Sequence, residues 1–119
     1  MKKTLVLGAS KRQNSYAYLA LLQLAKNNID TIGIGLEKGE IANISILTGT
    51  PQLSDIHTIT LYLNPKRQVA LLDYMISLKP KRVIFNPGTE NPEAYEKLRK
   101  AGIEVEIACT LVLLATGQY

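Results

Sequence analysis

Hydrophobic residues gather in five short runs along the chain, and each run is rich in residues that favour strands. The runs are Thr4–Gly8, Thr31–Ile34, Thr58–Tyr62, Arg82–Asn86 and Ile103–Ile107. The first, third and fourth runs show little alternation between apolar and polar positions, which is typical of parallel strands covered on both faces. The fifth run alternates strictly, which indicates an edge strand with one solvent-exposed face.

Helical patterns lie between these runs. In the first pattern, leucines recur at helical spacing, and Asn14 or Ser15 is placed to cap the helix. In the third, Pro92 at the first helical position and Glu93 in the first turn are both favourable. The predicted helices are Tyr16–Asn27, Lys66–Leu78, one that Asn91 caps and Gly102 ends, and a short apolar one within Cys109–Thr116.

Alternating strands and helices predict one α/β domain over residues 1–119, with right-handed βαβ connections. We expect a Rossmann-like, three-layer α/β/α fold with a five-stranded parallel sheet in the order 3-2-1-4-5. The segment 35–57 breaks the alternation because it holds no helical pattern. It is interpreted as a loop with a stub of strand at Ile44–Leu47 and one turn around Ser54.

Composition fits an ordinary globular protein: 46% of the 119 residues are hydrophobic and 20% are charged. The single cysteine, Cys109, cannot form an internal disulfide, which fits a reducing compartment. The first apolar stretch is shorter than the roughly 7–15 residues of a signal peptide. No apolar run approaches the roughly 20 residues of a membrane span. We therefore expect a cytoplasmic protein with no membrane partner.

The formal net charge is +4, from 14 basic and 10 acidic side chains. The basic residues form no stripe with interleaved aromatic residues, so nucleic acid is not expected as a partner. One basic cluster, residues 79–82, precedes the fourth run at the amino edge of the sheet. It is interpreted as a solvated face.

Glycine-containing loops follow the first and fourth strands. In such sheets ligands bind beyond the carboxyl ends of the strands, where the strand order reverses, here between the first and fourth strands. Small residues let backbone N–H groups approach a phosphate, and a helix N-terminus favours its charge. The candidate residues in the two loops are Gly8, Ala9, Ser10, Asn14, Ser15, Asn86, Pro87 and Gly88.

Basic residues flank these loops at helix starts. Lys11 and Arg12 belong to the first loop, and Lys66 and Arg67 open the next predicted helix. Cations at helix N-termini are unfavourable by about 0.3–1 kcal/mol, so an anionic ligand would account for them. Glu90 is a candidate acceptor for ribose, adenine or backbone donors.

Three segments together resemble a known family. They are Gly8-Ala9-Ser10, Asn86-Pro87-Gly88-Thr89-Glu90-Asn91 and Ala108-Cys109-Thr110-Leu111. In these segments the chain resembles the small stand-alone CoA-binding domain proteins, relatives of the nucleotide-binding domain of the succinyl-CoA synthetase α-subunit. The resemblance implies a Rossmann-like fold and coenzyme A across the first and fourth strand ends. Family members often carry proline and a basic residue where this chain has Gln13 and Ser15.

Two residues after the second strand allow two different contacts with the ribose of a bound ligand. Lys38 could reach the 3′-phosphate of coenzyme A, whereas Glu37 could bind a ribose diol as in NAD sites. The sequence does not decide between these two interpretations.

No catalytic set is evident. His57 precedes the third strand, away from the ligand edge, and Cys109 has no assignable base. One histidine and one cysteine make a transition-metal site unexpected. We predict a non-catalytic module that binds coenzyme A or acyl-CoA, alone or with a partner enzyme. The alternatives are a nicotinamide-dependent or thiol acyl-transfer enzyme, and a protein-interaction adaptor that has lost the ligand.

Overall fold

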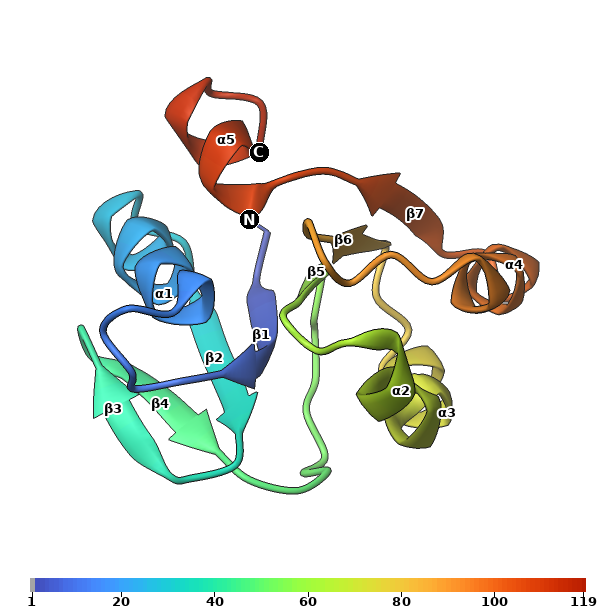
Figure 1. Cartoon of the computed structure of the whole chain (residues 1–119), viewed down its shortest axis with the longest axis horizontal. Coiled ribbons are helices and arrows are strands. Elements are labelled where there is room, and N and C mark those ends of the chain that lie inside the picture. Colours follow the sequence, from blue (N-terminus) through green and yellow to red (C-terminus); the bar gives the residue numbers. More distant parts are fainter. Residues whose placement is uncertain (1) are drawn as a thin grey trace.

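Seven strands form one sheet in the computed structural model, which describes residues 2–119 (Figure 1). The strand order is β3-β4-β2-β1-β5-β6-β7, and each neighbouring pair is parallel apart from the antiparallel pair β3–β4. The strands are β1 Thr4–Ala9, β2 Thr31–Gly35, β3 Gly39–Ile41, β4 Ile44–Leu47, β5 Thr58–Leu61, β6 Arg82–Phe85 and β7 Glu104–Ile107. The Rossmann-like, mostly parallel α/β fold is therefore as predicted.

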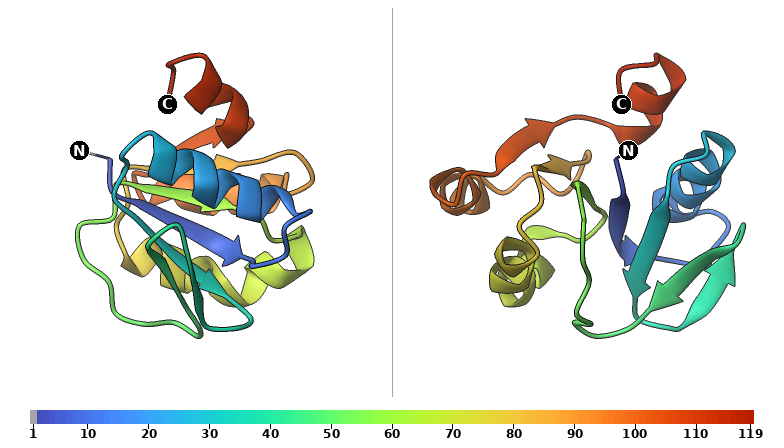
Figure 2. Two further views of the ribbon diagram at one scale, coloured as in Figure 1. Left: turned by 90° about the vertical axis from the view of Figure 1, so that its left-hand side faces the viewer. Right: turned by 180° about the vertical axis from the view of Figure 1, so that it is seen from behind.

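Helices cover both faces of this sheet (Figures 1 and 2). They are α1 Tyr16–Lys26, α2 Pro65–Gln68, the 3-10 turn η1 Val69–Leu71, α3 Leu72–Ser77, α4 Pro92–Lys100 and α5 Thr110–Ala115. The pair α1 and α5 lies on one face, and α3 and α4 lie on the other. Of the described helices, none is both long and apolar enough to cross a membrane.

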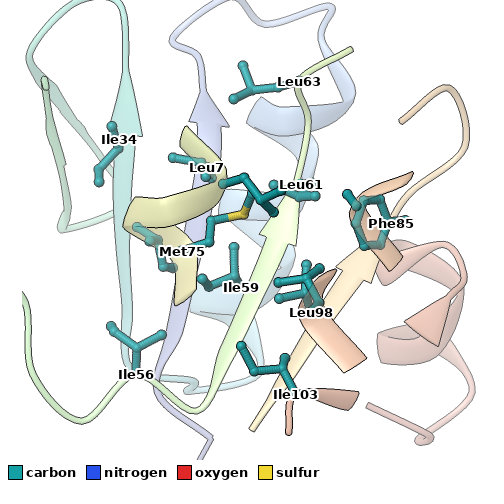
Figure 3. Close-up of a cluster of buried hydrophobic side chains, with 14 residues drawn as sticks. Leu7, Ile34, Ile56, Ile59, Leu61, Leu63, Met75, Phe85, Leu98 and Ile103 are labelled. Carbon is teal, nitrogen blue, oxygen red and sulfur yellow. The ribbon is translucent and has the colours of Figure 1, made fainter. Parts of the chain in front are cut away.

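The core has two parts because successive strand residues point to opposite faces of the sheet. Leu5 and Leu7 of β1 pack toward α3 and α4, whereas Val6 packs toward α1. Figure 3 shows the larger part, in which Met75 of α3 and Leu98 of α4 meet side chains from the central strands. All five of these side chains are fully buried.

The predicted number and order of strands are wrong. The strand at residues 58–61 was expected beside β2, but it is β5 and lies between β1 and β6. The place beside β2 belongs to β4, the segment expected to be only a stub. The strand order therefore reverses between β1 and β5. The loop after β5, rather than the one after β6, directly faces the first glycine loop.

The missed element is the β3–β4 hairpin. Its two turn residues, Ala42 and Asn43, have φ of 50° and 68°. Two-residue turns with positive φ at both positions suit the twist of hairpins, but their usual signal is Asn-Gly or Asp-Gly. Because this turn has Ala42 at its first position, the sequence lacks the usual hairpin signal.

The predicted helix over residues 66–78 is interrupted. It begins after the Asn64 cap, tightens into η1 and resumes as α3. The 3-10 turn changes the direction of the apolar face, so Leu72 and Met75 are buried while Val69 is 74% exposed. An uninterrupted helix would have placed Val69 on the same face as Leu72.

Arg82 is buried, contrary to the expected solvated cluster. Its Nε donates to Thr58 Oγ1 (2.9 Å), and its Nη1 donates to Glu106 Oε1 (3.0 Å). Its Nη2 donates to the backbone oxygen of Tyr119 (2.8 Å), and the guanidinium lies 4.4 Å from the centre of the Tyr119 ring. The side chain therefore links β5, β6 and β7 to residue 119 at the amino edge of the sheet.

Candidate functional site

A cleft of about 1210 Å³ opens at the carboxyl ends of the central strands. Its floor is formed by the ends of β1 and β2, and its walls by the segments that follow β1, β2, β4, β5, β6 and β7. The lining comprises residues 7–12, 15–17, 34–37, 49–50, 62–64, 67, 70–71, 86–89, 109 and 111. This position is the usual ligand site of doubly wound sheets.

Most of the residues singled out from the sequence lie together in this cleft. Those that line it are Gly8, Ala9, Ser10, Lys11, Arg12, Ser15, Arg67, Asn86, Pro87 and Gly88. Those outside its lining are Asn14, Lys38, Lys66 and Glu90. The lining also includes residues outside this candidate set. Asn64 and Leu71 follow the central strand β5, and Thr89 and Leu111 belong to the segments that carry the family resemblance.

The glycine loop is packed tightly between β5 and β2. Gly8 has φ of +97°, and a Cβ there would lie 2.9 Å from the carbonyl atoms of Tyr62. On the other side, a Cβ at Gly35 would lie 2.2 Å from the backbone oxygen of Ala9. Real Cβ atoms do not approach backbone atoms so closely, so both positions require glycine. The first loop thus leaves β1 close to the sheet and forms the cleft floor.

The turn into α1 is held by its own hydrogen bonds. The Ser15 hydroxyl donates to the backbone oxygen of Arg12 (2.8 Å) and accepts the N–H of Tyr18 (3.1 Å). Ser10 Oγ accepts the N–H of Arg12 (3.1 Å). Ser15 is therefore the N-cap of α1.

Three cationic side chains line the cleft. Lys11 lies near an acidic residue, with its Nζ 3.8 Å from Glu37 Oε2. Arg12 and Arg67 are exposed, and neither forms an ion pair with a carboxylate among residues 2–119. The N–H of Arg67 donates to Asn64 Oδ1 (2.9 Å), which caps α2 and sets the direction of the Arg67 backbone. The cleft can therefore offer two uncompensated guanidinium groups to an anion.

Asn86 braces the wall after β6. Its Nδ2 donates to Thr60 Oγ1 (2.7 Å) and to the backbone oxygen of Leu61 (2.8 Å). Its Oδ1 accepts the N–H of Thr110 (2.8 Å), the first residue of α5. Because these bonds occupy the buried amide, its role in the cleft is to position β5, β6 and α5 relative to one another.

The loop after β6 is closed by two side chains of its own. Thr89 Oγ1 donates to the backbone oxygen of Asn86 (2.7 Å), and Glu90 accepts the N–H of Gly88 (2.8 Å). Glu90 therefore acts on the loop backbone, from outside the cleft lining. Of the ribose, adenine and backbone donors expected for Glu90, this contact is with a backbone N–H.

Gln68 is a positioning residue that the sequence did not suggest. It is fully buried, and its Nε2 donates to the backbone oxygens of Leu63 and Thr89, both at 2.8 Å. Its Oε1 accepts from Asn91 Nδ2 (3.0 Å). Gln68 directly follows Lys66 and Arg67, so its local sequence gives no sign that it is buried. Gln68 ties the loop after β5 to the loop after β6.

Tyr62 and Cys109 add chemically distinct groups to the cleft. Burial raises the pKa of Tyr62 to about 12, and its hydroxyl makes no hydrogen bond among the described residues. Cys109 is a half-buried free thiol that also lines the cleft.

His57 lies before β5, at the opposite edge of the sheet. Within residues 2–119, no group of three or more side chains is arranged to hold a metal ion.

His57 makes the stability of the fold depend on pH. Burial first, and then the nearby charges of Arg82, Lys2 and Lys81, lower the pKa of His57 below 6.5. The unfolded chain therefore takes up this proton more readily than the folded chain. The free energy of unfolding is expected to fall as the pH drops below about 6.5.

Urea unfolding at several pH values, compared with His57→Gln, measures this contribution. The variant is expected to flatten the dependence between about pH 7 and pH 5.5. Identical slopes for both proteins would contradict the assignment to His57.

Comparison with known proteins places these features in context. A family model described as CoA binding domain matches residues 2–115. A crystal structure of an uncharacterized protein shares 49% identity over 100% of this chain and 98% of its own, with a TM-score of 0.96. No curated protein matches the chain.

More distant structures share the fold. A hypothetical protein from Pyrococcus horikoshii OT3 is 24% identical over 93% of this chain and 80% of its own, with a TM-score of 0.83. A Thermus thermophilus structure, cell-free ID.343, is 20% identical over 99% of this chain and 90% of its own, with a TM-score of 0.87.

Proposed function

Because the chain belongs to the CoA binding domain family, we propose that the cleft binds coenzyme A or acyl-CoA without catalysing a reaction. The observation that carries this proposal is the pair of exposed guanidinium groups of Arg12 and Arg67 on one cleft, neither paired with a carboxylate among the described residues. The diphosphate of coenzyme A is a doubly charged group that suits such a pair.

The remaining lining supports an extended ligand with a polar and an apolar part. The glycine loop offers backbone near the cationic side chains, as phosphate-binding loops do. Pro87, Leu111 and Tyr62 contribute apolar surface near the thiol of Cys109. We propose that the diphosphate binds at the glycine loop and that the pantetheine arm runs toward Pro87 and Leu111.

A binding role without turnover is favoured by the side chains present. The lining contains no histidine, and its carboxylate, Glu37, is 81% exposed. Bound coenzyme A would bring a thiol or thioester, which a partner enzyme could use.

A thiol acyl-transfer enzyme is the second candidate, because Cys109 lines the same cleft. In that case an acyl group would pass from the thioester sulfur of acyl-CoA to Cys109 and release free coenzyme A. Mass spectrometry after incubation with acetyl-CoA distinguishes the two. The binding-module proposal predicts unmodified Cys109, whereas acetylation that Cys109→Ser abolishes would support the enzyme.

Isothermal titration with coenzyme A tests the proposed site. Replacing Arg12 and Arg67 together by glutamine is expected to weaken binding about 10- to 100-fold, since charge-assisted hydrogen bonds are lost. Arg99→Gln is the matched control, because this exposed arginine lies on α4, outside the cleft. No heat at about 1 mM coenzyme A would overturn the proposal, because the affinity would be too weak for a specific site.

A further inference from the structure

The end of the cleft beyond β2 carries a carboxylate and an apolar surface. Leu36 and Glu37 follow β2 directly, and both line the cleft. Leu36 is 78% exposed although it is a large apolar residue. Lys38, the alternative contact for a ribose phosphate, lies outside the lining. Acid and apolar surface together suit a nucleoside, whose hydroxyls need acceptors and whose base needs a flat contact.

At this end of the cleft, Lys11 is already paired with Glu37. A Cβ on Gly39 would lie 2.5 Å from Lys11 Cδ, so the stem of Lys11 crosses β3 where there is no side chain. Its ammonium group then lies 3.8 Å from Glu37. The charge of Lys11 is therefore matched by that of Glu37, unlike the charges of Arg12 and Arg67.

The Glu37 carboxylate would distinguish a ribose with free hydroxyls from a ribose that carries a phosphate. A carboxylate accepts hydrogen bonds from neighbouring ribose hydroxyls, and an acid after the second strand performs this task in dinucleotide-binding sheets. A phosphate on the same ribose carries nearly two negative charges at neutral pH, which the carboxylate of Glu37 would repel.

We propose that Glu37 makes the β2 end of the cleft a subsite for an adenosine ribose with free hydroxyls. This inference rests on the proposed function, since it assumes that a CoA-type nucleotide enters the cleft. It adds that dephospho-CoA, which lacks the 3′-phosphate, binds more tightly than coenzyme A itself. Glu37 is then the residue that determines this specificity.

Titration of the intact protein with dephospho-CoA and with coenzyme A tests the inference. Dephospho-CoA is expected to bind about 3- to 10-fold more tightly, as one screened charge repulsion is removed. Glu37→Gln is expected to close this gap by tightening coenzyme A. Glu40→Gln, the same change on exposed β3 outside the cleft lining, is expected to leave the ratio of affinities unchanged.

Each other outcome overturns a defined part of the account. Tighter binding of coenzyme A than of dephospho-CoA, or a ratio that Glu37→Gln does not alter, would overturn the role of Glu37 alone. Binding of neither ligand would overturn the proposed function, and this inference would fall with it.

Discussion

Replacing Gly8 with alanine is expected to lower the free energy of unfolding by about 2–5 kcal/mol. Positive φ costs a residue with a Cβ roughly 1–2 kcal/mol, and overlap with packed atoms adds about 1–3 kcal/mol. At Gly8 both penalties apply, because φ is +97° and the Cβ would meet the Tyr62 backbone at 2.9 Å. Urea unfolding of the purified variant measures the change.

Gly102→Ala separates the two penalties. Gly102 also has positive φ, at +80°, but a Cβ there would meet nothing within 4 Å. It is expected to lose only about 1–2 kcal/mol. Equal losses for the two variants would contradict the claim that the glycine loop is pressed against β5.

Replacing Asn86 with leucine is expected to lower the free energy of unfolding by about 2–4 kcal/mol. The Thr110 N–H would lose its acceptor in a buried place, and the oxygens of Thr60 and Leu61 would each lose a donor. Because α5 begins at Thr110, the cleft wall that carries Cys109 and Leu111 would lose its side-chain link to the end of β6. Urea unfolding measures the stability, and titration with coenzyme A measures the expected loss of affinity.

Asn14→Ala is the control for this experiment. Asn14 is exposed and makes none of the described side-chain hydrogen bonds, so its removal is expected to change stability by less than about 0.5 kcal/mol. A loss at Asn86 as small as that at Asn14 would contradict the bracing role.

Local signals in the sequence predict the central strands and the glycine loops. The run at residues 4–8 is uncharged and apolar at Leu5, Val6 and Leu7, as suits a strand covered on both faces, and β1 is buried on both sides. Gly8 ends this run and lies at the irregularity in the pairing of β1 with β2, between Leu7 and Ala9. Because these features depend on neighbouring residues alone, they can be recognised without knowledge of the fold.

Strand order is a property of the whole sheet, and one weak element was enough to misplace it. Ile44–Leu47 is only four residues long and lies between Gly39 and Gly49 in a segment without a helical pattern, so it is interpreted from the sequence as a stub of strand within a loop. Once β4 occupies the place beside β2, β5 must lie on the other side of β1. Asn64 and Leu71, which follow β5, then reach the cleft, although their local sequence carries no sign of it.

Polar residues that connect distant segments are the other part that sequence patterns do not reveal. Arg82 stands in a basic cluster, yet it is buried because its partners Glu106 and Tyr119 come 24 and 37 residues later. Gln68 likewise depends on Thr89, 21 residues away. Burial of such groups is favourable only when every partner is in place, and the partners are supplied by the tertiary fold.

A crystal structure of the protein grown with coenzyme A tests the central claim most directly. The account predicts ligand density in the cleft between Gly8 and Gly88, with the diphosphate about 3 Å from donors of the glycine loop or the Arg12 and Arg67 guanidinium groups. Coenzyme A bound at another surface, or a cleft that holds only solvent at a saturating concentration, would contradict it.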